Sequence, residues 1–364
     1  MCEYERLRSE KRAPDFSGMT EADRAAEAER LREEAFEEAR RLPEGRRRLE
    51  AEARARILDF DPKQGGIYYN SFNLADLIYR NSFSLADLYT FDLAEEESPI
   101  GPMRFTNKVF DDEEIELTEA INILSVKVAR SDVGFPIHVY GTVIVRDSID
   151  LKRVYLFNRD RQHCQLINSK DEPLILTGPK RGLALLDDNY VEIDLKIKDH
   201  QGEDRELSKG ILTISGIARR SLEKCEVDRL SLATRLSTVK VEYAFVISAV
   251  EATIAIEVEE GEFCGTVTAY LTSINKRLVL YDRKLADHMP GNGLGAIKMM
   301  RPVISVCFSD VLLIVARAHG GKAVGLGIAP RISNEYGVGF SLGTAKMSLR
   351  IDWSIVNPST RGAC

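Results

Sequence analysis

Cysteine is scarce and scattered in this sequence. Isolated cysteines are typical of free or buried thiols in a reducing compartment, whereas a disulfide scaffold needs a dense framework. The sequence therefore favours an intracellular protein that does not depend on disulfides. The six cysteines, which include no C-x-x-C pair, are Cys2, Cys164, Cys225, Cys264, Cys307 and Cys364.

The sequence also lacks a secretory signal and a membrane-spanning segment. The N-terminal residues Met1–Arg6 are not followed by the apolar core of a signal peptide. No apolar run approaches the roughly 20 residues of a membrane helix. The longest, near Val311–Ala316, ends at Arg317. We expect a soluble protein in the cytoplasm or nucleus, with no membrane partner.

Basic residues are fewer than acidic residues in this sequence. Lys and Arg number 50 against 57 Asp and Glu, which gives a net charge of -7 and an acidic pI near 5.5. A nucleic-acid footprint over the whole chain is therefore not expected, because such surfaces are rich in Lys and Arg. Hydrophobic residues reach 44%, enough to bury a core in 364 residues.

Recognisable catalytic motifs are missing. The sequence has no G-x-S-x-G nucleophile elbow, and its glycine-rich stretches Gly291–Gly295 and Gly320–Gly321 do not form a phosphate-binding loop. We therefore predict no catalytic residue, no metal ligand and no cofactor, and a protein that is not an enzyme. None of the five histidines has metal-ligand spacing with Cys, Asp or Glu: His138, His163, His200, His288 and His319.

Two weaker candidate sites remain. Acidic residues could bind calcium if their loops converged, because calcium needs about 6 to 8 oxygen ligands. The basic turn Thr177–Gly182 carries Lys180 and Arg181, which could meet a phosphate or an acidic partner, although a solvated turn is the preferred interpretation. The aspartates considered for calcium are Asp132, Asp147, Asp150, Asp187 and Asp188.

The N-terminal part of the chain differs in composition from the rest. Residues 20–56 are rich in Ala, Glu and Arg and are predicted to be helical, so residues 1–57 form a charged helical leader. Its apolar spacing fits no heptad, so the sequence does not support a coiled coil. A connector follows at residues 58–115, in which Asn70–Leu77 recurs as Asn81–Leu88 after eleven residues. We interpret this tandem repeat as a tolerated loop insertion, and the alternative interpretation is a docking segment.

Residues 116–356 have the alternating pattern of half-buried antiparallel strands, followed by a tail at 357–364. Gly141–Arg159 aligns without gaps on Gly265–Arg283, with seven of nineteen positions identical. We therefore predict a mainly β protein, an antiparallel β-sandwich built from two related halves at about 116–225 and 237–356. Strands are expected at residues 191–197, 239–247, 252–258 and 347–355, and a helix only at 221–236.

Five phrases of the sequence are distinctive in combination: Asp61–Gly66, Glu97–Arg104, Asp132–Val143, Leu176–Gly182 and Tyr190–Lys198. Together they resemble a family of cereal-plant proteins that share a domain of unknown function. The resemblance covers about residues 58–356. The same domain resembles the C-terminal part of the jasmonate-induced ribosome-inactivating protein of cereals, which adds an N-terminal rRNA N-glycosidase domain. The resemblance implies a setting in stress or defence.

The glycosidase activity itself is not expected here. Glu27–Arg30 and Glu38–Arg41 match a short E-A-x-R form of the glycosidase signature, but they lie in an Ala/Glu/Arg-rich run where chance matches are common. Only 26 residues precede Glu27, too few for the adenine-stacking scaffold. The leading hypothesis is a non-enzymatic binding module with a protein partner. The alternatives are an accessory translation-inhibiting or ribosome-associated factor and a calcium-dependent β-sandwich.

Overall fold

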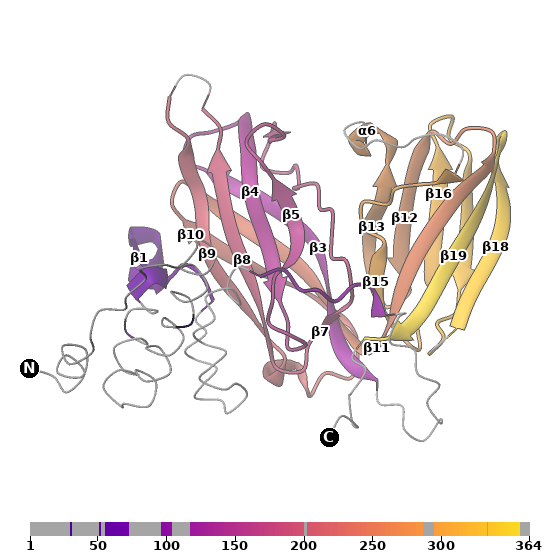
Figure 1. The fold of residues 1–364 in the computed structure, drawn as a ribbon, viewed down its shortest axis with the longest axis horizontal. Coiled ribbons are helices and arrows are strands. Elements are labelled where there is room, and N and C mark those ends of the chain that lie inside the picture. The colour runs from indigo at the N-terminus through magenta and orange to yellow at the C-terminus, as the bar shows by residue number, and fades with distance from the viewer. Residues whose placement is uncertain are drawn as a thin grey trace, which may run out of the picture. The chain divides into compact units, whose positions relative to one another are not determined.

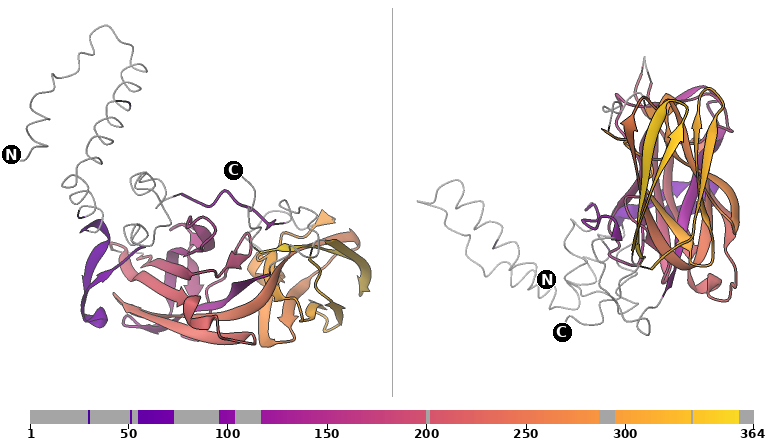
Figure 2. Two further views of the ribbon diagram at one scale, coloured as in Figure 1. Left: turned by 90° about the horizontal axis from the view of Figure 1, so that it is seen from below. Right: turned by 90° about the vertical axis from the view of Figure 1, so that its right-hand side faces the viewer.

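The computed structural model describes residues 30, 51, 55–72, 96–103, 117–199, 202–286, 295–332 and 334–356 (Figures 1 and 2). These residues lie mostly in antiparallel β-sheets, which confirms the mainly β prediction. The predicted helical leader and the tail fall almost entirely outside the described residues. No helix among the described residues has the length and hydropathy needed to cross a membrane.

The N-terminal half of the β-region has two layers. A five-stranded sheet in the order β5-β4-β8-β9, with β6 beside β4, packs against strands in the order β10-β11-β3-β7. Apolar side chains from both layers fill the space between them. The strands are β3 (Thr118–Ser131), β4 (Ile137–Arg146), β5 (Val154–Arg159), β6 (Gln165–Ile167), β7 (Leu183–Ala184), β8 (Asp188–Ile197), β9 (Arg205–Ser215) and β10 (Glu226–Thr234).

The C-terminal half repeats this arrangement. A four-stranded sheet in the order β13-β12-β16-β17 packs against strands in the order β18-β19-β11-β15, and a second apolar core lies between them. The strands are β12 (Gly265–Leu271), β13 (Ile274–Asp282), β14 (Gly295–Ala296), β15 (Val303–Cys307), β16 (Leu312–Ala318), β17 (Ala323–Ile328), β18 (Asn334–Leu342) and β19 (Ala345–Ile355), with a short helix α6 (Arg283–Ala286) after β13.

One strand, β11 (Ser237–Glu260), belongs to both halves (Figure 1). Its first part pairs with β3 and β10, and its second part pairs with β15 and β19. The change of partners occurs at Ser248, whose φ of 43° lies in the left-handed region and accompanies a register shift between Val246 and Ala249. The strands predicted at 239–247 and 252–258 are therefore one continuous strand.

The internal sequence repeat corresponds to equivalent strand pairs. In β4–β5, Val143 faces Phe157 and the next pair is shifted by a bulge. In β12–β13, Val267 faces Tyr281 and the bulge follows at the same place. These four positions are aligned in the sequence repeat, so the two segments share register as well as residues.

The two glycines that open the repeat have the same structural role. A Cβ atom on Gly141 would lie 2.1 Å from the carbonyl oxygen of Asp194, and one on Gly265 would lie 2.1 Å from the carbonyl oxygen of Arg317. These oxygens belong to the neighbouring strands β8 and β16, so each glycine allows two backbones to approach closely.

The predicted helix at 221–236 is wrong. Residues Glu226–Thr234 form β10, which pairs with β11 along its whole length from Glu226–Phe245 to Thr234–Ser237. The hydrogen bonds and burial offered by the neighbouring strand outweigh a weak helical preference. The only helical turn nearby is the 3-10 helix η4 (Ile217–Arg219).

We expect Gly141→Ala and Gly265→Ala each to lower the free energy of unfolding by roughly 1 to 3 kcal/mol, because the added methyl group collides with backbone rather than with a movable side chain. Chemical denaturation of the purified protein measures the loss. Gly320→Ala is the control, because nothing lies within 4 Å of a Cβ atom at Gly320. Equal stabilities for all three variants would contradict this account.

Candidate functional site

The phrase Asp61-Pro-Lys-Gln-Gly folds into a tight turn for local reasons. The side chain of Asp61 accepts a hydrogen bond from the backbone N–H of Lys63 at 2.9 Å, Pro62 supplies a fixed φ, and Gly65 adopts the left-handed conformation that ends the turn. The turn is the 3-10 helix η1 (Pro62–Gln64), and it joins β1 (Leu58–Asp61) to β2 (Gly66–Tyr69) as a two-stranded hairpin.

The inner face of this β1–β2 hairpin is fixed to the N-terminal half of the β-region. The second carboxylate oxygen of Asp61 accepts a hydrogen bond of 2.5 Å from the backbone N–H of Arg235, in the turn between β10 and β11. The Tyr68 hydroxyl donates to the carbonyl of Lys209 on β9 at 2.9 Å. Contacts to one strand and to one turn of the N-terminal half hold the hairpin in one orientation.

The outer face of the hairpin is apolar and exposed. Phe60 is 63% exposed, Ile67 is 74% exposed and Tyr69 is 38% exposed. They alternate with the inward-facing Asp61 and Tyr68, so the pleat of the two strands sends them to the opposite side. These three side chains are called the apolar face below.

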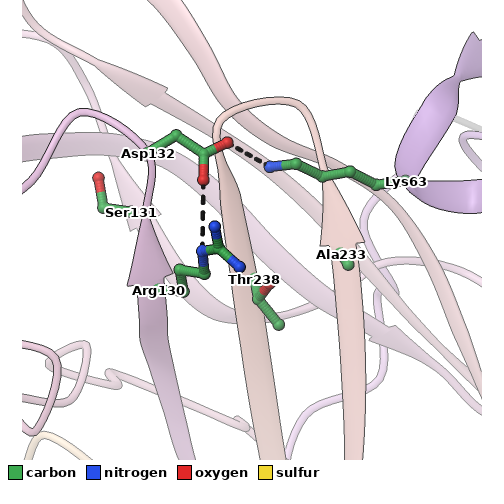
Figure 3. A pocket seen from close by; sticks show the side chains of 6 residues that line it. All are labelled: Lys63, Arg130, Ser131, Asp132, Ala233 and Thr238. Carbon is green, nitrogen blue, oxygen red and sulfur yellow. Dashed lines mark hydrogen bonds and ion pairs between the residues drawn. The ribbon is translucent and has the colours of Figure 1, made fainter.

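An open pocket of about 680 Å³ lies beside the hairpin (Figure 3). Three strands supply a cross-strand row beneath it, in which Thr238 of β11 lies opposite both Ala233 of β10 and Arg130 of β3. Because Ala233 is small, the row leaves space above it. The pocket, called the hairpin pocket below, is lined by Lys63, Arg130, Ser131, Asp132, Ala233 and Thr238.

The charges of the hairpin pocket are unevenly paired. The Lys63 ammonium donates to Asp132 Oδ2 at 2.5 Å and closes the turn onto the end of β3. This hydrogen bond from Lys63 holds the pKa of Asp132 below its usual range, and the Arg130 charge acts in the same direction. The Arg130 Nε atom lies 3.6 Å from Asp132 Oδ1, and the Arg130 side chain is 79% exposed.

The chain that leaves the hairpin is anchored as well. The Ser71 hydroxyl donates to Glu192 of β8 at 3.2 Å, and the Arg146 guanidinium donates to the same carboxylate at 2.6 Å. The Phe72 ring packs on Tyr190 with centroids 4.4 Å apart. Asn70, Ser71 and Phe72 begin the first copy of the tandem repeat, and the remainder of both copies lies outside the described residues.

The structure does not bring the five aspartates considered for calcium together. Asp132 precedes the start of β4 and Asp147 follows its end, so the ten residues of β4 separate them by roughly 30 Å. Asp147 and Asp150 instead bind Arg181. Within the described ranges, no group of three or more His, Cys, Asp or Glu side chains could hold a metal ion.

The basic turn at 177–182 is not solvated, which corrects the preferred interpretation. The side chain of Arg181 is fully buried and makes two hydrogen bonds to Asp147, at 2.5 and 2.8 Å. Lys180 binds Glu97 at 2.7 Å. Both cations therefore have acidic partners within their own chain.

A buried carboxylate on β11 extends this cluster. Glu251 has no exposed surface and accepts hydrogen bonds from the backbone N–H groups of Gly182, at 2.6 Å, and Met103, at 2.7 Å. Burial raises the pKa of Glu251, while these donors and the nearby Arg181 charge oppose that rise. The contacts tie two loops to the shared strand.

The described histidines lie apart from the hairpin pocket. His163 contacts Asp160 at 2.8 Å in an exposed loop, and the Nδ1 atom of His138 lies 3.8 Å from the Cys164 sulfur. His319 follows β16, in the turn that leads to β17. His200 and His288 lie outside the described residues.

Sequence reasoning missed the hairpin within the predicted connector. The signal was present: Asp61-Pro62 with Gly65-Gly66 is a turn signature, and apolar residues stand two positions apart on each side of it, at Leu58 and Phe60 and at Ile67 and Tyr69. The pocket had no comparable signal, because Lys63 and Asp132 are 69 positions apart and meet only when the hairpin docks.

We expect Lys63→Met to raise the pKa of Asp132 toward its ordinary value, because the variant removes the hydrogen bond that favours the carboxylate. Carboxyl-carbon NMR titration measures the change. A lowered folded-state pKa means that the contact stabilises the fold fully above the ordinary aspartate pKa, and that this contribution is lost as the pH falls through the lowered value. Lys170→Met is the control, and an unchanged Asp132 titration in Lys63→Met would contradict the assignment.

Asp147→Ala should lower the free energy of unfolding by about 3 to 5 kcal/mol, because it removes the fully buried carboxylate that makes two hydrogen bonds to the Arg181 guanidinium and leaves only the longer carboxylate contact, to Asp150. Glu97→Ala removes the exposed partner of Lys180 in the same turn and should cost less than about 1 kcal/mol. Urea denaturation of both variants provides the comparison. Similar losses in the free energy of unfolding for the two variants would mean that the buried Arg181–Asp147 pair contributes no more to stability than an exposed pair.

Comparison with known proteins gives a family and little else. No curated protein matches the sequence. Among solved structures, human GIVD cytosolic phospholipase A2 is similar at 9% identity and a TM-score of 0.22, over 67% of this chain but only 31% of the phospholipase. Extended-synaptotagmin 2, C2A- and C2B-domains, is similar at 11% identity and a TM-score of 0.22, over 68% of this chain and 98% of that chain.

Such weak structural similarity supports no argument about ligand or activity. The family match is of a different kind, because it covers residues 120–341, more than half of the chain and nearly all of the β-region. The chain therefore belongs to the family defined by the domain of unknown function DUF6598.

Proposed function

We propose that this protein is a non-enzymatic interaction module that binds a protein partner through the apolar face of the β1–β2 hairpin. The observation that supports the proposal is the contrast between the two faces of the hairpin. One face is hydrogen-bonded to β9 and to the β10–β11 turn, and the other exposes Phe60, Ile67 and Tyr69.

The chemistry of the apolar face suits a protein surface. Adjacent exposed apolar side chains mark interaction sites more often than singly exposed ones do, and aromatic residues are enriched among the residues that dominate binding energy. The hairpin is already fixed by Asp61 and Tyr68, so binding would require little ordering of the backbone. The partner that fits is a protein with an apolar surface that covers Phe60 and Ile67.

We propose that the two halves are copies of one sandwich unit, related by duplication. The equivalent strand orders, the shared bulge after Val143 and Val267, and the equivalent glycines Gly141 and Gly265 support this. The fusion left β11 as the last strand of the first copy and the first strand of the second.

The biological setting of the proposal comes from the sequence alone. The resemblance implies plant stress or defence, with a link to the jasmonate-induced ribosome-inactivating protein, and the missing signal peptide and membrane segment favour the cytoplasm or nucleus. Co-sedimentation with ribosomes from stressed tissue distinguishes a translation-associated factor from a module with another partner.

The test compares the full-length protein with a Phe60→Ser/Ile67→Ser double variant in quantitative affinity purification. Partners of the apolar face should fall by about tenfold or more, because truncation of dominant interface residues costs 2 kcal/mol or more. Ile217→Ser is the matched control, since Ile217 is 55% exposed on η4. An identical partner set for all three proteins would refute the proposal.

A further inference from the structure

The hairpin pocket contains a positive charge that the protein's own carboxylate only partly balances. Lys63 and Arg130 face one carboxylate, that of Asp132, so the lining carries an excess of one positive charge. Lys63 takes the close contact at 2.5 Å, whereas Arg130 remains at 3.6 Å, beyond hydrogen-bond range.

The position of Arg130 inside a pocket separates it from an ordinary surface arginine. Its guanidinium lies between Asp132 and Thr238, over the row that Thr238 forms with Ala233 (Figure 3). Lys63 reaches the same carboxylate from the side of the docked hairpin. Two cations that converge on one carboxylate, beside a hydroxyl and a small side chain in an open pocket, leave room for a second compact group of negative charge.

We propose that the hairpin pocket binds a compact oxyanion, a carboxylate or a phosphate, held by the Arg130 guanidinium with the Lys63 ammonium as a second cation. A guanidinium offers planar paired donors that match both kinds of oxyanion. The Asp132 carboxylate lies close to the same two cations and therefore competes with the ligand for them. The site is independent of the proposed partner surface, since none of its lining residues belongs to the apolar face.

Isothermal titration of the full-length protein with inorganic phosphate, and separately with citrate, tests the proposal and distinguishes phosphate from carboxylate ligands. Arg130→Gln should weaken binding by about tenfold or more, because a hydrogen bond to a charged group is lost. Asp132→Asn should tighten binding several-fold by removing the competing carboxylate, and salt should weaken binding in every variant that binds.

Arg350→Gln is the matched control, because Arg350 is a 51% exposed arginine on β19 that lies near Glu335 and Asp352. Arg130→Gln leaves the Lys63–Asp132 contact in place, so a loss of binding cannot be attributed to release of the hairpin. Failure of both anions to bind at millimolar concentration, or equal losses in Arg130→Gln and Arg350→Gln, would overturn the proposal. The Phe60→Ser/Ile67→Ser variant should bind anions normally, which separates failure here from failure of the partner surface.

Discussion

The continuity of β11 is the constraint on which the described β-region depends. Its odd-numbered residues from Val239 to Phe245 enter the core of the N-terminal half, and its even-numbered residues from Val250 to Val258 enter the core of the C-terminal half. Near Ala244 and Val246 the strand contributes to the second core while it still pairs within the first half. The two halves are therefore joined at this point by one continuous sheet as well as by apolar contacts.

Buried charge reinforces this junction. Glu251 lies on β11 opposite Ser305 of β15 and Ser354 of β19, and it holds the backbone of Gly182 and Met103. A buried carboxylate is tolerated only where donors surround it. Gly182 and Met103 lie outside the described strands, and their hydrogen bonds to Glu251 hold the backbone of these two segments against β11.

Sequence reasoning succeeded where structure depends on residues close together in the chain, and it failed where structure depends on residues far apart in the chain. Alternation in Val191–Ile197 and Met347–Ile355 reports local burial and located β8 and β19 correctly. The same signal divided β11 in two, because the buried positions change from odd to even near Ser248 and only strand pairing shows that the chain continues.

The charged groups show the limit of the same reasoning. Composition and spacing identified Arg181 but placed it in solvent, because the decisive contact with Asp147 joins residues 34 positions apart. The hairpin pocket was hidden for the same reason, since its walls meet only in the folded chain. The lack of catalytic motifs can be read from the sequence. The position of the hairpin pocket cannot, because it depends on where the β1–β2 hairpin packs on the N-terminal half of the β-region.

The shared strand also sets an order for folding as the chain is synthesised. The first half has all its strands once Ala249 has emerged from the ribosome, and it can close while residues of the second half are still being added. The second half begins on a strand whose earlier residues are already held by β3 and β10. A ribosome-bound chain would thus present the second part of β11 as an extended strand with which β15 and β19 pair. The position of β11 in the first half would then set the pairing register of the second half.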